Sequence, residues 1–302
     1  MKKIILFLSI MAVLFSCNSN KTDNASNTQA ASSSTDFKAE ISFDGSSSLA
    51  PVMASIGNKF MEEYVTWDKV SSDLPNEKIS IYVSSAGSGA GVKSILDNTA
   101  SFGMLARKIR DNEKSQMSNY KEFLVASDAL TVSVNAKNPI VKIKDNLDSD
   151  TIRKIFSGEY KYWSDVDASL PQKEIVVIIR DLSGGAYEVF QESIMGETQI
   201  SANAIQSPSM GALGTKIVEN EHAIGYASYG VYNQNKDNLF AFKVDGVEPT
   251  KENILNGQYK IQRPLMFIKN SELSKSESAF VDYVFSDIGK QIVEENGYIP
   301  VE

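Results

Sequence analysis

Cysteine and histidine are almost absent from the chain, with one of each among 302 residues. The lone cysteine, Cys17, excludes an internal disulfide framework. One histidine, His222, cannot form a Cys/His cluster that would hold a transition metal. It stands in a turn before an expected strand, where a surface turn residue is a simpler interpretation than a member of a catalytic triad. These counts disfavour a transition-metal site and a histidine-dependent triad, and we expect no metal or cofactor.

Positive charge is also scarce, because 30 Lys and Arg residues face 38 Asp and Glu residues, for a net charge of −8. Loss of Lys2 and Lys3 with an N-terminal signal would take this to −10. Proteins that bind nucleic acid carry basic faces, so this class is disfavoured. An anion site in this chain must therefore work through local dipoles and hydrogen bonds.

The N-terminal apolar run, from Ile4 to Phe15, is too short to span a bilayer as a stable anchor. With the basic start before it, the run predicts a signal peptide over residues 1–16. Leu14-Phe15-Ser16-Cys17 resembles a bacterial lipobox, which implies cleavage before Cys17 and lipid attachment there. The alternative is a plain secretory signal with a coincidental cysteine. Either interpretation predicts export, and lipidation would hold the protein at the membrane, on its periplasmic or extracellular face.

Residues 17–37 are rich in Ser, Asn, Thr and Ala and show no apolar period, which is typical of a flexible tether. The remaining chain, about 265 residues, is long enough for two modest domains.

The first part of this remainder repeats the unit strand, Ser/Gly turn, helix. The pattern predicts a strand at Ile41–Phe43, a turn at Gly45–Ser48 and a helix at Leu49–Tyr64 with apolar residues at helical spacing. A strand at 79–83, a turn at 87–91 and a helix at 92–98 follow. This repetition predicts an α/β fold with ligands at the carboxyl ends of the strands.

Further strands are expected at 101–106, 129–135, 174–179, 223–227 and 264–268. Helices are expected at 149–156, with Ser149 as its cap, and at 187–195 and 212–219. A terminal helix pair is expected over 276–295, with Gly289 between its members. Trp67, Trp163, Tyr226 and Tyr229 are interpreted as packing residues.

Three Ser/Gly-rich turns lie at strand-to-helix junctions, at 44–48, 86–91 and 180–186. Free N–H groups at a helix start favour an anion, and three such turns suggest convergence on one oxyanion. For the first turn the simpler alternative is an ordinary N-cap. The second, around Ser88, has neither dinucleotide-fingerprint spacing nor nucleophile-elbow spacing, and an anion-binding nest or a plain turn remains open. In the third, Arg180 suits bidentate contact with an oxyanion, and a structural ion pair is the alternative.

Several strings resemble the periplasmic or lipid-anchored phosphate-binding proteins of ABC phosphate importers. Gly45-Ser46-Ser47-Ser48-Leu49-Ala50-Pro51 and Gly87-Ser88-Gly89-Ala90-Gly91-Val92-Lys93 are similar to the family's two phosphate loops. Ile155-Phe156-Ser157-Gly158 with Trp163-Ser164-Asp165-Val166 is the most specific piece. Phe102-Gly103-Met104 with Arg107, Asn220 with Ala223-Ile224-Gly225-Tyr226, and Arg263-Pro264-Leu265 also fit, so the resemblance covers nearly the whole mature chain.

The resemblance implies a two-lobed periplasmic-binding-protein fold of type II, each lobe a mixed sheet flanked by helices, with a hinge between them. Lobe I would comprise residues 38–130 plus 263–302, and lobe II residues 131–262. The implied phosphate ligands are Ser47, Ser48, Ser88, Arg180, Ser183, Gly184, Gly185 and Ala186. The resemblance implies an exported binding protein, not an enzyme, that captures inorganic phosphate or a related oxyanion and delivers it to an ABC permease in the cytoplasmic membrane. We expect a monomer.

The chain departs from this family at two places. Gly184-Gly185-Ala186 stands where the family has Ser-Gly-Thr, so two hydroxyl donors are missing, and Ser183 would replace one of them. Ala106 stands where the family has an acid or serine that helps to distinguish protonated phosphate from sulfate. One alternative function is therefore a sensor or scavenger lipoprotein for another oxyanion or for a protein partner. A secreted serine hydrolase that uses Ser88 is a further alternative.

Overall fold

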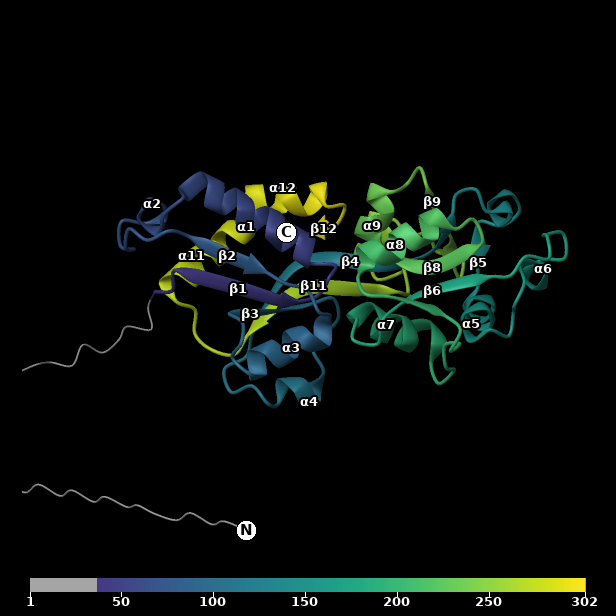
Figure 1. Cartoon of the computed structure of the whole chain (residues 1–302), viewed down its shortest axis with the longest axis horizontal. Coiled ribbons are helices and arrows are strands. Elements are labelled where there is room, and N and C mark those ends of the chain that lie inside the picture. Colours follow the sequence, from purple (N-terminus) through teal and green to yellow (C-terminus); the bar gives the residue numbers. More distant parts are fainter. Residues whose placement is uncertain (1–36, 302) are drawn as a thin grey trace, which may run out of the picture. The chain divides into compact units, whose positions relative to one another are not determined.

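The computed structural model describes residues 37–301 (Figure 1). The predicted signal peptide, Cys17 and all of the predicted tether except Phe37 lie outside the described residues. Between residues 37 and 301 no helix is long and apolar enough to cross a membrane.

Twelve β-strands form in the described part of the chain. They are β1 (Glu40–Gly45), β2 (Ser80–Val83), β3 (Phe102–Leu105), β4 (Lys121–Asn135), β5 (Asn146–Leu147), β6 (Val176–Arg180), β7 (Ile205–Ser207), β8 (Ala223–Ser228), β9 (Leu239–Ala241), β10 (Lys243–Val244), β11 (Gln262–Lys269) and β12 (Ile299–Pro300).

The same residues form twelve α-helices, a 3₁₀ turn and a π-helical turn. The helices are α1 (Ala50–Tyr64), α2 (Trp67–Val70), α3 (Ser88–Leu96), α4 (Asp111–Lys114), α5 (Ser149–Ser157), α6 (Trp163–Val166), α7 (Gly185–Phe190), α8 (Met210–Glu219), α9 (Tyr229–Gln234), α10 (Lys251–Leu255), α11 (Lys275–Val284) and α12 (Asp287–Glu295). The 3₁₀ turn is η1 (Pro139–Lys142), and the π-helical turn η2 (Gln191–Met195) continues α7.

The long strand β4 connects two mixed sheets. Its first part pairs antiparallel with β11, and its last part, from Leu130 to Val134, pairs antiparallel with β8. The strand order along this path is β2-β1-β3-β11-β4-β8-β6-β7, in which β1 is parallel to β2 and β3, and β6 is parallel to β7 and β8. We call the part around β1, β2, β3 and β11 lobe I and the part around β6, β7 and β8 lobe II. The residue boundaries predicted for the lobes remain a prediction.

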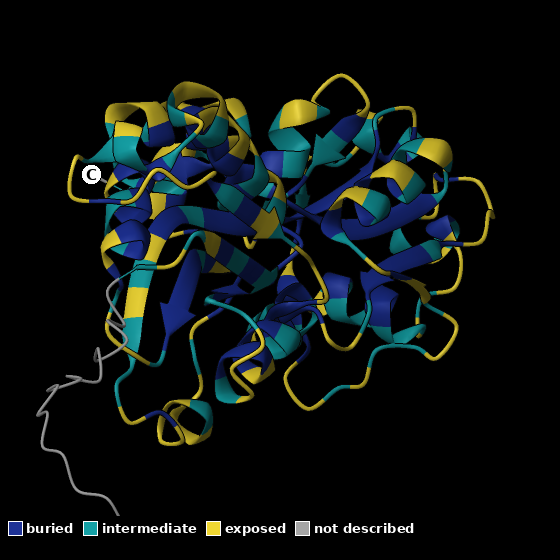
Figure 2. Ribbon diagram, turned by 60° about the vertical axis from the view of Figure 1, so that its left-hand side comes forward, coloured by how far each residue is buried: buried dark blue, intermediate teal, exposed yellow. Residues whose placement is uncertain are grey.

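Each lobe is a sheet between two layers of helices. In lobe I, α1, α11 and α12 cover one face and α3 covers the other, and in lobe II α8 and α9 lie opposite α5 and α7 (Figure 1). The strands are buried while the outer faces of the helices are exposed (Figure 2). The central strands β3 and β6 are buried on both faces and need cover on both, whereas β1 and β2 alternate between buried and more exposed residues.

Aromatic side chains fill both cores. In lobe I the ring of Phe267 lies 5.1 Å from that of Phe102 and 4.9 Å from that of Phe123. Trp67 and Trp163 are 0% and 1% exposed, as predicted for packing residues. Trp163 Nε1 donates to the His222 carbonyl at 3.2 Å, so the Trp163 string serves to build the core of lobe II.

Three local expectations were wrong. Helix α3 begins at Ser88, so most of the second Gly-rich segment is the first turn of the helix itself. The cap of α5 is Asp148, whose carboxylate accepts the Thr151 N–H, because Ser149 already lies inside the helix. Gly289 lies within α12, where a Cβ would come 2.0 Å from the Val284 carbonyl oxygen, so this glycine allows α11 and α12 to approach closely.

Phe267→Ala should lower the free energy of unfolding by about 3–5 kcal/mol, because the ring is fully buried and its loss leaves a cavity among other aromatic rings. Urea denaturation measures this effect. Tyr82→Ala is the control, since Tyr82 is 57% exposed and its removal should change stability by about 1 kcal/mol or less. Equal losses for the two variants would contradict this account of the core.

Candidate functional site

The three Ser/Gly-rich turns meet in one small cavity between the lobes, which we call the inner cavity. About 150 Å³ there lies outside the protein atoms, a volume that includes open solvent, so the lobes are tightly closed around it. Its lining comes from the ends of β1, β3 and β6, the starts of α3 and α7, and strand β11. The lining residues are Ser46, Ser47, Ser48, Gly87, Ser88, Ala106, Arg180, Gly185, Ala186 and Arg263. A ligand in this space can have only a few non-hydrogen atoms.

The turn before α1 is held by its own serine. Ser46 Oγ accepts the N–H groups of Ser48 and Leu49 at 3.2 and 3.3 Å, so it stabilises the turn before the helix, whose N-cap Leu49 has no side-chain cap. The Ser48 N–H is thus bonded within its own turn. The serines of this segment thus differ in their contacts. Ser46 bonds main-chain N–H groups of its own turn, whereas the hydroxyls of Ser47 and Ser48 accept from Arg180 and Arg263.

Two hydroxyl groups of the inner cavity are arranged as donors. Ser47 Oγ accepts from Arg180 Nη1 at 2.7 Å and from the Met210 N–H at 3.3 Å. A serine hydroxyl has two acceptor lone pairs and one proton, so the Ser47 proton remains to be donated. Ser88 Oγ accepts the Ala106 N–H at 3.0 Å, which likewise orients its proton away from that amide. Oriented hydroxyl protons favour a ligand that accepts hydrogen bonds.

Arg180, the last residue of β6, is only 2% exposed and is fixed by main-chain oxygens. Its Nε donates to the Ser207 carbonyl at 3.1 Å, and its Nη2 donates to the Pro208 carbonyl at 3.2 Å. Asp181 is a distant counter-ion, with 3.4 Å between Nη2 and Oδ2. Burial lowers the pKa of the Arg180 guanidinium, whereas Asp181 opposes this change. Arginine nevertheless keeps its charge in proteins, so the cavity contains a poorly neutralised cation.

Glycines let the two lobes come together at this site. A Cβ on Gly185 would lie 2.4 Å from Ser88 Oγ, on the opposite lobe, and 3.2 Å from the Ala106 carbonyl oxygen. A Cβ on Gly184 would lie 2.9 Å from the Arg180 Cζ. A side chain at 184 would therefore compete with the guanidinium for space, which gives a physical reason for the missing serine there.

Ser183 and Gly184 are the two predicted ligands that do not line the inner cavity; the other six predicted residues do. The Ser183 hydroxyl donates to Asp181 Oδ1 at 2.6 Å and lies 3.2 Å from the Ala86 carbonyl oxygen of the other lobe. Ser183 thus connects the lobes, and its replacement of a missing hydroxyl donor stays a prediction. The direct ligand roles of all eight residues remain predictions.

Sequence reasoning missed the second arginine of the site. The sequence patterns place Arg263 only in the string Arg263-Pro264-Leu265 and assign no role to Asp128. Arg263 is 3% exposed and lines the inner cavity, and its Nη2 lies 2.7 Å from Asp128 Oδ2. The available signal was a charged residue directly before each of two expected strands, Asp128 before 129–135 and Arg263 before 264–268. No carboxylate lines the inner cavity, where Ala106 contributes only a methyl group and main-chain atoms.

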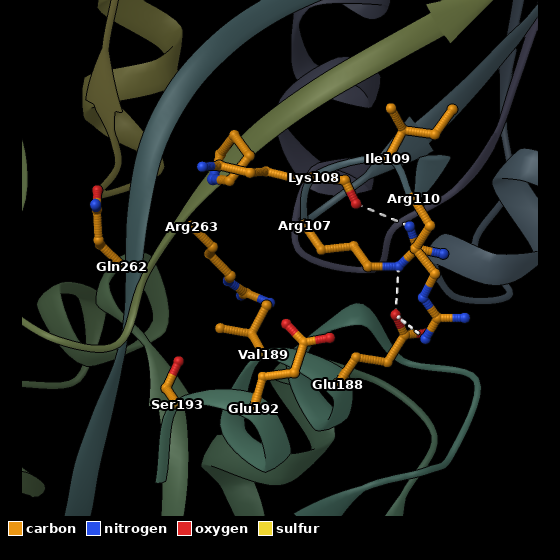
Figure 3. A pocket seen from close by; sticks show the side chains of 11 residues that line it. Arg107, Lys108, Ile109, Arg110, Glu188, Val189, Glu192, Ser193, Gln262 and Arg263 are labelled. Carbon is orange, nitrogen blue, oxygen red and sulfur yellow. Dashed lines mark hydrogen bonds and ion pairs between the residues drawn. The ribbon is translucent and has the colours of Figure 1, made fainter. Parts of the chain in front are cut away.

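A larger cavity, the outer cavity, adjoins the inner one at Arg263 (Figure 3). Across it, Glu188 Oε2 of lobe II lies 2.6 Å from Arg107 Nε and 2.8 Å from Arg110 Nη2 of lobe I. Glu113 holds the far side of the Arg107 guanidinium at 2.7 and 2.8 Å. These ion pairs join the lobes directly beside Ala106 and Ala186. Residues 37–301 contain no group of three or more His, Cys, Asp or Glu side chains that could hold a metal ion.

Comparisons with known proteins agree with this geometry. A model of the PBP superfamily domain matches residues 24–287. The phosphate-binding protein PstS of Staphylococcus haemolyticus is 34% identical over 276 residues, which cover 87% of this chain and 82% of the relative. PstS of Staphylococcus aureus strain MRSA252 is 33% identical over 280 residues, covering 89% and 80% of the two chains.

Solved structures give the same result. A candidate phosphate ABC transporter substrate-binding protein from Clostridium perfringens, solved with bound phosphate, superimposes with a TM-score of 0.74 at 29% identity. The match covers 87% of this chain and 100% of the other. An ABC-type phosphate transport receptor from Vibrio cholerae, at 23% identity and a TM-score of 0.66, shares the fold and covers 86% and 100% of the chains. The predicted two-lobed α/β fold is confirmed, and the chain belongs to the phosphate-binding proteins of the PBP superfamily.

Proposed function

We propose that this chain is an exported solute-binding protein that captures inorganic phosphate between its lobes and delivers it to an ABC importer. The observation that carries the proposal is the meeting of Arg180 with the hydroxyls of Ser47 and Ser88 in one buried cavity. A guanidinium and oriented hydroxyls are donors that suit a tetrahedral oxyanion. The names of the Staphylococcus relatives and the bound phosphate in the Clostridium structure support the choice of phosphate.

In the proposed mechanism the lobes close on the anion and exclude water. Hydrogen bonds to a charged ligand then act in a low dielectric, where they are stronger than in water. The starts of α3 and α7 add main-chain N–H groups that lack partners within their helices. The closed form, held also by Glu188 against Arg107 and Arg110, would be the form that the permease recognises.

The proposal includes no bond-making step. His222 accepts the Val176 N–H through its carbonyl at 3.1 Å, at the beginning of β6. Arg180 ends that strand, so His222 lies about 13 Å along it from the inner cavity. This separation argues against a hydrolase in which Ser88 is activated by His222.

The remaining parts of the proposal concern the cell. Export through residues 1–16, lipid attachment at Cys17 and a tether over 17–37 would place the binding lobes outside the cytoplasmic membrane. The protein would act as a monomer, since one chain supplies both walls of the inner cavity.

Arg180→Ala should weaken phosphate binding well over tenfold, because each lost hydrogen bond to a charged group costs about 1.5–3 kcal/mol. Isothermal titration calorimetry measures this against a buffer control. A folded wild-type protein that gives no phosphate heat at micromolar concentration would sink the proposal. A loss below tenfold in the variant would remove Arg180 from the site.

Gly185→Ala should weaken phosphate binding at least about tenfold, because the new methyl group collides with Ser88 and keeps the lobes apart. Small-angle X-ray scattering should show less compaction on phosphate addition than in the wild type. Gly211→Ala is the matched control, since a Cβ at that position would have no other atom within 4 Å. Wild-type affinity in both variants would show that the lobes do not approach as described.

Sulfate should compete with phosphate within about tenfold in affinity, because no carboxylate lines the inner cavity to accept a proton from phosphate or to repel sulfate. Ala106→Asp should weaken sulfate binding more than phosphate binding. Competition calorimetry at neutral pH measures both affinities. A wild-type preference for phosphate of about a thousandfold would instead mean that another acceptor discriminates.

A further inference from the structure

Arg263 and Asp128 form a buried ion pair where β4 passes from lobe I to lobe II. They are directly opposite each other in the antiparallel pairing of β11 with β4. Arg263 Nε and Nη2 lie 2.8 and 2.7 Å from Asp128 Oδ2, and the two side chains are 1% and 0% exposed. A buried arginine held by one carboxylate has a fixed orientation, so its remaining donors point in a fixed direction.

Two N–H groups of Arg263, both on Nη1, have no close partner. A guanidinium has five N–H groups. Asp128 takes two of them, and Ser48 Oγ takes a third from Nη2 at 2.9 Å. Nη1 has only a long contact of 3.4 Å with the Ala106 carbonyl oxygen. Arg263 lines the inner cavity and also the outer cavity, where Figure 3 shows it, so Nη1 can reach a ligand between them.

The charges of the two arginines also call for an anion. Arg263 lies close enough to Arg180 for its charge to lower the pKa of that guanidinium, after the larger effect of burial. Asp128 neutralises one of the two cations, whereas Asp181 is 3.4 Å from Arg180 and partly exposed. A buried charge without a close counter-ion is costly, and an oxyanion between the guanidinium groups would remove that cost.

We infer that Arg263 is a second guanidinium ligand of the anion and that Asp128 is the residue that positions it. This inference rests on the proposed capture of phosphate. Asp128 Oδ1 also accepts the Tyr229 N–H of lobe II at 2.9 Å. The same carboxylate thus orients a ligand donor of lobe I and holds the main chain of lobe II, which couples anion binding to the arrangement of the lobes.

Arg263→Lys tests the ligand role. Lysine keeps the charge but cannot reproduce the planar fork that contacts Asp128, Ser48 and the anion together. Calorimetry should show phosphate binding weakened about a hundredfold. Lys269→Arg is the matched control, because Lys269 lies on the same strand, is 3% exposed and is held by one buried carboxylate, Glu277, at 2.9 Å, but does not line the inner cavity. The phosphate affinity of Lys269→Arg should stay within about threefold of that of the wild type.

Asp128→Asn tests the positioning role through a double-mutant cycle. Alone it should weaken phosphate binding about tenfold, and in the Arg263→Lys background it should cause little further loss, because both changes remove the same donor geometry. Additive losses would assign Asp128 a merely structural role. Melting temperatures of the free variants establish that each one is folded.

A phosphate-bound crystal structure of the wild type keeps the inference testable even if these variants do not fold. A phosphate oxygen should lie within about 3.2 Å of Arg263 Nη1. The inference would be overturned if every phosphate oxygen lay beyond about 4 Å from Arg263 Nη1, or if Arg263→Lys bound phosphate with wild-type affinity. The proposed function would stand in either case, provided that Arg180→Ala still loses binding. Absence of phosphate binding by the wild type would overturn the proposed function itself.

Discussion

The burial of two guanidinium groups between two lobes is the constraint on which the rest of the structure depends. Removing a charge from water costs several kcal/mol unless it is paired and fully hydrogen-bonded. Asp128 satisfies Arg263, while the main-chain oxygens of Ser207 and Pro208 hold Arg180. In the strand order β11 pairs with β4, and β8 lies between β4 and β6. Both arginines nevertheless line the inner cavity. Two cations with one close counter-ion leave local positive charge inside a chain of net charge −8.

Close approach of the lobes brings this positive charge together with the serine hydroxyls of lobe I. Gly185 allows Ser88 and the start of α7 to lie in contact, and Ser47 of lobe I meets Arg180 of lobe II at 2.7 Å. The lobes are also joined beside the inner cavity by Glu188 and Arg107. Glu113 remains on Arg107 if the lobes separate, so opening does not leave that guanidinium without a partner. The ion pair between the lobes can therefore form and break without exposing a lone buried charge on lobe I.

Most of the fold and part of the site could be predicted from the sequence. Features encoded by neighbouring residues were predictable, whereas contacts between residues far apart in the sequence were not. Ser47, Ser88 and Arg180 lie at ends of strands or starts of helices, and local patterns mark those positions. The pairing of Arg263 with Asp128 joins residues 135 positions apart and depends on the register of β11 with β4. No local pattern encodes that register. The exclusion of Ser183 from the inner cavity likewise depends on its contacts with Asp181 and with Ala86 of the other lobe.

The departures of this chain from its family become consistent once Arg180 and Arg263 are considered together. A serine at 184 would need the space taken by the Arg180 guanidinium, so its loss accompanies the position of that group. A carboxylate at position 106 would lie beside the N–H donors of Arg263 and would neutralise the positive charge of its guanidinium. Ala106 leaves that charge available to an anion. The lining of the inner cavity thus combines few hydroxyls and no acid with two buried arginines. The proposed pair of arginine ligands would select an anion chiefly by negative charge and small size, and only weakly by whether the anion carries a proton.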